Sequence, residues 1–268
     1  MTPILKKMGK SLFTVVLLLG IPFLNAGLQI DLSDEDLQPL ISLSDRYCSM
    51  FIWEGKPPEL KIVDREIRTE RIMLKNYDVV YLNNGSASGL QVGQVFLIVE
   101  IGPKIKKFGR IARKRGRARI IMVDEGKAAA ELEHICSAVK IGHALIPFEE
   151  KEGRMGKDLG YDVLIPEGEG IIGRFLYLHD GLVQIGSTHR ALIDLGSQDG
   201  IQIGDQLLVF RRNSKNAFLR AFANMVVINV QSRTSTVKIL SCKDVVRITD
   251  SVTIRPKDTS LPSGAGVY

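Results

Sequence analysis

One stretch of the sequence concentrates charge of a single sign. Nine basic residues and no acidic residue lie between positions 104 and 119: Lys104, Lys106, Lys107, Arg110, Arg113, Lys114, Arg115, Arg117 and Arg119. A run of this kind favours binding of an anion or of an acidic partner. The alternative interpretation is a solvated hairpin that faces nothing.

Other residues that could do chemistry lack the pattern that the chemistry needs. The glycines of Gly168–Gly173 fit a dinucleotide motif, but such a site needs a helix after the glycines, and Arg174–Leu178 reads as a strand. The cysteines form no CxxC pair, and no serine stands in a GxSxG motif. No metal-ligand spacing connects the four histidines, which are His134, His143, His179 and His189. We therefore expect no catalytic site, no cofactor and no metal.

The N-terminus has the layout of a secretory signal peptide. Three lysines precede an apolar stretch, Ser11–Leu24, which is followed by a small residue, Ala26. We expect cleavage after residue 26 and a periplasmic protein; an uncleaved membrane anchor is the alternative. Without the three signal lysines the formal charge of +6 falls to about +3, so the chain outside the basic run is near −6. Export argues against nucleic acid as the partner and leaves anionic lipid, lipopolysaccharide, peptidoglycan or an acidic envelope protein.

Three cysteines are an odd number for an oxidising compartment. Cys136 and Cys242 each lie just before a terminal strand of their own repeat, so we interpret them as equivalent, buried small apolar residues. A disulfide between two of the three, Cys48 included, is the alternative, and the sequence does not choose the pair.

The elements that must hold the basic run form an internal repeat. Tyr81–Val99 and Leu192–Phe210 align at a fixed offset of 111 residues. Each copy reads as strand, turn and strand, and the first turn glycine, Gly85 or Gly196, is expected to adopt a positive φ. The glycines that we assign to turns are Gly85, Gly89 and Gly93 in the first copy and Gly196, Gly200 and Gly204 in the second.

Short alternating apolar segments surround both copies and predict strands. The fold class is therefore expected to be mainly β, with two tandem small barrel-like or sandwich-like domains and a short N-terminal helix within Asp31–Met50. The expected layout is a signal peptide (1–26), an N-terminal segment (27–58), a first β repeat (59–148), a linker (149–162), a second β repeat (163–256) and a flexible tail (257–268).

The repeat resembles an exported β domain of LysM-containing bacterial envelope proteins. The matching residues are Tyr81, Asn83, Gly85, Gly89, Gly93 and Phe96, followed by Gly116, Arg117, Ala128, Ala130, Ser137, Ile141, Gly142 and Pro147. Residues Leu195–Asp205 are also similar to the C-terminal domain of the flagellar assembly protein T. The resemblance implies an envelope-associated β protein without catalytic residues; no LysM module is visible in this chain.

These observations predict a non-enzymatic periplasmic scaffold or assembly protein for the cell wall, a flagellum or a secretion machine. The alternative is an anion-binding module whose basic hairpin docks on anionic lipid or lipopolysaccharide. Only the first repeat carries the basic run, so we expect function to lie in what the two copies do not share.

Overall fold

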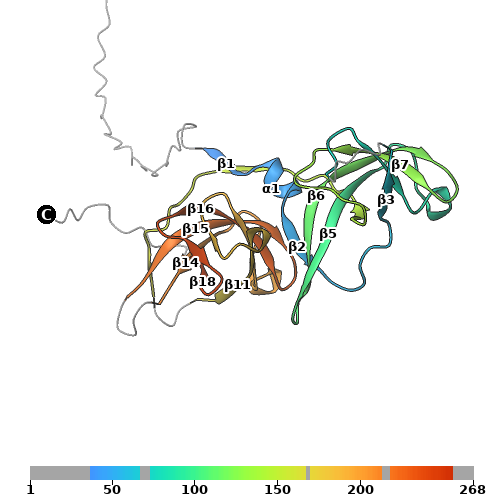
Figure 1. Cartoon of the computed structure of the whole chain (residues 1–268). Helices are drawn as coiled ribbons and strands as arrows, with labels where there is room; N and C mark the ends of the chain where they lie inside the picture. The colour runs from blue at the N-terminus through green and yellow to red at the C-terminus, as the bar shows by residue number, and fades with distance from the viewer. Residues whose placement is uncertain (1–36, 67–72, 167–169, 213–217, 256–268) are drawn as a thin grey trace, which may run out of the picture. The chain divides into compact units, whose positions relative to one another are not determined.

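The computed structural model describes residues 37–66, 73–166, 170–212 and 218–255 (Figure 1). The expected signal peptide (1–26) and the tail (257–268) lie outside these residues. The described part is mainly β, which confirms the expected fold class. None of its helices combines the length and the apolar character needed to cross a membrane.

The first repeat forms a closed six-stranded barrel in the described residues. Its strands pair in the order β3-β4-β7-β6-β5-β8, and the ring closes where Ile62 donates its backbone N–H to His143 (3.0 Å) and Lys61 bridges to Ala144. The strand bounds are β3 (Ile62–Arg65), β4 (Val79–Leu82), β5 (Val95–Ile105), β6 (Gly109–Val123), β7 (Ala128–Glu133) and β8 (Ala144–Pro147).

The second repeat forms a ring with the same strand order, drawn in yellow to red in Figure 1. Its order is β11-β13-β16-β15-β14-β18, and β18 pairs with β11 to close it. The bounds are β11 (Ile172–Leu178), β13 (Arg190–Ile193), β14 (Gln206–Phe210), β15 (Leu219–Val230), β16 (Ser235–Cys242) and β18 (Ser251–Ile254). Each strand of one ring therefore has a counterpart at the same place in the other.

Short strands outside the two rings complete the second repeat. The strand β10 (Leu164–Ile165) adds to β15, and β12 (Gln184–Ile185) pairs with β17 (Val246–Arg247). The strand β11 begins at Ile172, within the glycine motif, and continues through Arg174–Leu178, which agrees with the strand interpretation of these residues.

Alternating burial explains why both rings close around a core. In β7 every second residue is buried, which places Ala128, Ala130 and Leu132 inside the first barrel. In β5, four consecutive residues of the apolar run Val95–Val99 are buried, from Phe96 to Val99. Separate clusters of buried side chains fill the two rings, as expected of two small barrels.

The repeated glycines serve the turns, but two of them do so for a different reason than expected. Gly85 and Gly196 have φ angles of −138° and −139°, so the prediction of a positive φ was wrong. They are glycines because a Cβ would lie 2.0 Å and 2.4 Å from backbone carbonyl oxygens of the facing hairpin. Positive φ angles occur at the other four turn glycines, namely Gly89, Gly93, Gly200 and Gly204.

The residues before the first barrel also form structure. They contain β1 (Gln38–Ile41), α1 (Leu43–Tyr47) and β2 (Met50–Trp53). The strand β2 pairs with β6, and β1 pairs with β9 (Arg154–Gly156), which lies in the segment expected to be a linker. A short helix is thus present in the expected region at Leu43–Tyr47; the acidic residues Asp34, Glu35 and Asp36 lie outside the described part.

Candidate functional site

The helix α1 is short and its start is fixed by its own side chains. The Asp45 backbone N–H donates to Ser42 Oγ (3.1 Å), and the Ser42 N–H donates to Asp45 Oδ2 (3.0 Å). This reciprocal arrangement is a capping box. The Ser-x-x-Asp spacing of Ser42 and Asp45 is the sequence signal that locates this helix start.

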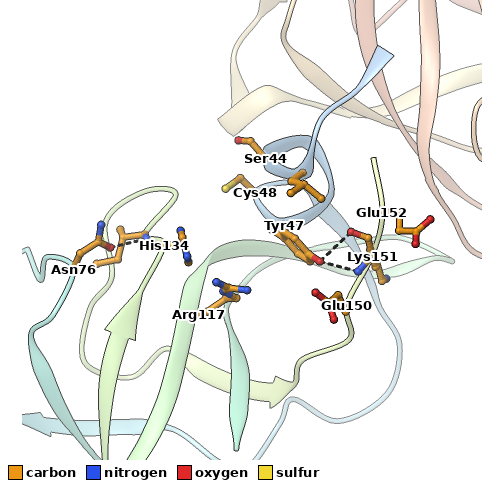
Figure 2. Close-up of a pocket in the computed structure, with 11 residues that line it drawn as sticks. Ser44, Tyr47, Cys48, Asn76, Arg117, His134, Glu150, Lys151 and Glu152 are labelled. Atoms are coloured by element: carbon orange, nitrogen blue, oxygen red, sulfur yellow. Dashed lines mark hydrogen bonds between the residues drawn. The ribbon is translucent and has the colours of Figure 1, made fainter. Parts of the chain in front are cut away.

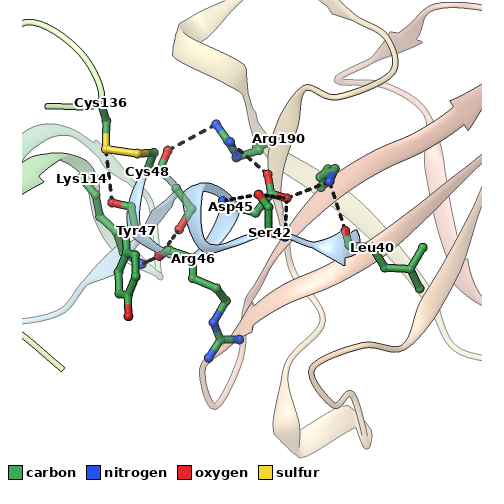
Figure 3. Close-up of polar contacts among 11 residues, drawn as sticks. Leu40, Ser42, Asp45, Arg46, Tyr47, Cys48, Lys114, Cys136 and Arg190 are labelled. Atoms are coloured by element: carbon green, nitrogen blue, oxygen red, sulfur yellow. Dashed lines mark hydrogen bonds and ion pairs between the residues drawn. A yellow bond between two sulfur atoms is a disulfide. The ribbon is translucent and has the colours of Figure 1, made fainter. Parts of the chain in front are cut away.

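The carboxylate of Asp45 connects α1 to the second barrel (Figure 3). It accepts hydrogen bonds from Arg190 of β13 (3.0 Å) and Lys238 of β16 (2.7 Å), and only 4% of the residue is exposed. Burial acts to raise the pKa of this carboxyl, but the hydrogen bonds from Lys238 and Ser42 outweigh it, so the pKa lies below its ordinary value. Asp45 is therefore a buried anion held by two cations.

A disulfide connects the same segment to the first barrel. Cys48, directly after α1, is bonded to Cys136, which lies beyond β7 (Figure 3). Our interpretation of Cys136 as an unpaired apolar residue was therefore wrong, and the disulfide alternative is correct for this pair. Cys242 keeps a free, partly buried thiol.

Further contacts hold α1 and β2 against the second barrel. The Arg46 guanidinium donates to the Ile228 carbonyl oxygen of β15 (2.9 Å), and the Gln231 side chain exchanges two hydrogen bonds of 2.8 Å with the backbone of Ile52. Met50 accepts a hydrogen bond from Thr236 (2.6 Å). We call residues 42–53 the junction segment, because each barrel contacts it through side chains and backbone.

The basic run does not form one continuous surface. Its first four residues lie at the exposed end of the β5–β6 hairpin, and the structure gives them no ion pair with a described acidic residue; these are Lys104, Lys106, Lys107 and Arg110. Arg110 donates to the Gly102 carbonyl oxygen (3.2 Å). We call these four residues the hairpin tip.

The middle of the run points into the molecule. Glu100 of β5 accepts hydrogen bonds from both Arg113 (2.5 Å) and Arg115. Lys114 is buried and donates to the Arg46 carbonyl oxygen of α1 (2.5 Å). Burial, with neighbouring positive charges, lowers the pKa of Lys114 to about 7. These three cations therefore belong to the interior of the junction.

The end of the run pairs with an acid of the neighbouring strand. Glu133 of β7 contacts Arg119 (2.7 Å) and Arg117 (3.9 Å). The guanidinium of Arg117 also lies over the rings of Phe148 (4.9 Å) and Tyr47 (5.8 Å). Cation–π stacking of this kind fixes a side chain within the fold. Nine residues that look equivalent in the sequence thus occupy three different environments.

A cavity of about 790 Å3 opens beside the junction segment (Figure 2). The Tyr47 hydroxyl donates to the Lys151 carbonyl oxygen (3.0 Å) and accepts from the Lys151 N–H (2.7 Å). Arg117 and Lys151 line this cavity together with Glu150 and Glu152, so both signs of charge are present. The lining therefore gives no preference for ligands of one charge.

Within the residues that the structure describes, no three histidine, cysteine or carboxylate side chains are grouped to hold a metal ion. The site that the structure assembles is instead the junction: a buried carboxylate, a disulfide and the inward half of the basic run. Comparison of the chain with known protein families finds no matching family, and comparison with curated proteins finds no match either.

Proposed function

We propose that the protein is a non-enzymatic scaffold of the bacterial cell envelope that presents two barrels to a partner in a fixed relation. The observation that carries this proposal is the double attachment of the junction segment. Asp45 joins it to the second barrel through two buried ion pairs, and the Cys48–Cys136 bond joins it to the first. A linker that only had to tolerate motion would need neither attachment.

The disulfide also supports a location outside the cytoplasm, because disulfides form and persist in oxidising compartments. The predicted signal peptide agrees with that location. We therefore propose the periplasm as the site of action.

A photo-crosslinking experiment in living cells tests the scaffold. A photoreactive amino acid is placed at Lys106 in the first barrel or at Val183 or Phe218 in the second, where the last two residues are 82% and 89% exposed, and a further chain carries it at both Lys106 and Val183. We expect discrete adducts whose protein partners mass spectrometry identifies. The Asp45→Asn variant should keep adducts from single positions but lose products that connect both barrels to one partner.

The scaffold proposal would be rejected if none of these positions gave a discrete adduct. Release of the protein with cytoplasmic markers on fractionation would reject the location.

A second candidate function is docking of the hairpin tip on anionic lipid or lipopolysaccharide. It is favoured by the four exposed cations at the tip, which face solvent without an acidic partner among the described residues. The attraction should be strong at low salt and screened at high salt. The inward cations Arg113, Lys114 and Arg115 are not available for this contact.

Retention on vesicles with anionic phospholipid tests this second candidate. We expect loss of retention when the four tip residues are replaced by serine. The control removes the same charge from exposed lysines elsewhere, by changing Lys56, Lys61, Lys127 and Lys140 to serine. Equal retention of both variants would exclude docking through the tip.

A further inference from the structure

A second cavity lies beside the disulfide and shares Ser44, Cys48 and Ile135 with the lining of the first. Its volume is about 340 Å3, at the lower end of the range of roughly 300 to 1,000 Å3 that small-molecule sites occupy. Its lining holds four cationic side chains and one carboxylate, that of Asp180; the cations are Arg113, Lys114, Arg115 and Arg190. We call this space the basic cavity.

The nearby carboxylates do not balance these cations. Glu100 is shared by Arg113 and Arg115, and Asp180 also contacts Arg113 (3.8 Å). Asp45 is shared by Arg190 and Lys238 of β16. Three carboxylates thus pair with four cations. An excess of positive charge remains at the basic cavity.

Two residues that line the basic cavity have lowered pKa values. The pKa of Lys114 is lowered to about 7, mainly by burial and then by neighbouring positive charges, Arg190 among them. The pKa of His179 is also lowered, mainly by burial; Asp180 opposes the shift, while Arg190 and Arg115 add to it. Burial is the main cause of both shifts, and neighbouring positive charges act in the same direction.

The walls of the basic cavity also contain polar atoms whose hydrogen-bonding capacity is unused. Arg113 Nε, Arg190 Nε and His179 Nδ1 are buried and have no hydrogen-bond partner. Buried polar atoms of folded proteins nearly always have a partner in the protein or in bound solvent, so these three atoms can form hydrogen bonds to a bound molecule. The exposed residue Ser137 adds a hydroxyl to the lining, whereas the Ser49 hydroxyl already donates to the Arg46 carbonyl oxygen (3.4 Å).

We propose that the basic cavity binds a small oxyanion, namely a phosphate group that is free in solution or carried by a larger molecule. Arginine forks match the oxygen geometry of phosphate, and charge-assisted hydrogen bonds in a partly buried site are strong. A bound dianion would supply the missing negative charge and bridge the junction segment, β6 and β13. The site is independent of the scaffold function and differs from the hairpin tip, which faces solvent.

Calorimetric titration of the full chain with inorganic phosphate tests the site, with chloride at equal ionic strength as the reference. We expect binding that Arg113→Gln weakens about tenfold or more, the loss expected for one charge-assisted hydrogen bond. Ser137→Glu is the second variant. Ser137 is exposed at the cavity, so the added carboxylate should exclude phosphate without disturbing the core.

The control variant carries serine at all four residues of the hairpin tip. It loses more charge than either cavity variant and should bind phosphate like the native chain. A second arm uses vesicles that contain phosphatidic acid: retention that Ser137→Glu abolishes and the tip variant keeps would identify a headgroup phosphate as the ligand. Absence of binding in both arms at millimolar phosphate, or loss of binding in the tip variant alone, would overturn the proposal.

Discussion

The amine of Lys114 is buried among other positive charges at the junction segment. Replacing this residue therefore tests whether the burial of the amine affects the stability of the protein. The groups that influence it come from several elements: Arg46 of α1, Arg190 of β13, and Lys151 and Glu149 of the segment after β8. Replacement by methionine keeps a long unbranched side chain and removes the amine. We expect the effect of Lys114→Met on stability to depend on pH.

The direction of this pH dependence follows from the lowered pKa of Lys114. In the unfolded chain the amine titrates near 10.5, and in the folded protein near 7. Between these values the unfolded state holds a proton that the folded state lacks, so the Lys114 contribution to the free energy of unfolding rises with pH. At about 1.4 kcal/mol per pH unit, we expect a rise of roughly 2.5 kcal/mol between about pH 6 and about pH 9. Below pH 7 the buried charge destabilises the native protein.

The measurement is urea unfolding of the native chain and of Lys114→Met across this pH range, in a buffer without phosphate. The difference between the two free energies of unfolding cancels the contribution of every titratable group that the two proteins share. The variant should gain most over the native chain at the acid end and lose that advantage as pH rises. Lys106→Met removes an exposed amine and is the control, with a difference that stays constant.

The reasoning would be refuted if the stability difference between Lys114→Met and the native chain were as independent of pH as that of the Lys106→Met control. It would mean that the amine stays charged in the folded state, held by the Arg46 carbonyl oxygen and its surroundings. An advantage that grows toward alkaline pH would refute the sign.

Three further predictions concern the junction and the turns. Asp45→Asn should lower the free energy of unfolding by roughly 3 to 5 kcal/mol, because two buried cations lose their carboxylate partner. Urea unfolding measures this change. A decrease below about 1 kcal/mol would contradict a stabilising role of the two ion pairs. Gly85→Ala should destabilise more than Gly89→Ala, which costs roughly 1 to 2 kcal/mol, because only at Gly85 would the Cβ meet a backbone oxygen 2.0 Å away; equal thermal shifts would contradict this. Cys48→Ser should cost roughly 2 to 5 kcal/mol, since the bond closes a separation of 88 residues, and an excess of reductant should reproduce the loss in the native chain.

The barrels could be predicted because their signals are local. Alternation in β7 and the glycine turns at Gly85 and Gly196 depend on residues close together in the chain, and the repeat shows each turn twice. The repeat did not reveal why the first turn position must be glycine. A Cβ there would meet a backbone carbonyl oxygen of a hairpin that lies about forty residues further along the chain.

The junction could not be predicted, because its contacts join residues that no local pattern relates. Nothing near Asp45 in the sequence indicates Arg190 or Lys238 as partners. Charge counting also treated Arg113 and Lys106 alike, whereas Glu100 on the neighbouring strand turns the first inward and the hairpin leaves the second in solvent. The pairing of β5 with β6 determines which of these two cations is buried, and the linear sequence does not show this pairing.

The buried pair at Asp45 also has a consequence for the order in which the chain folds. Its partners follow it by 145 and 193 residues, so Asp45 is synthesised long before Lys238 exists. Contacts of such separation close late, after local strands have formed. Until β16 is in place, the carboxylate must stay hydrated and α1 cannot settle against the second barrel. The junction therefore closes only on a molecule in which both barrels are finished.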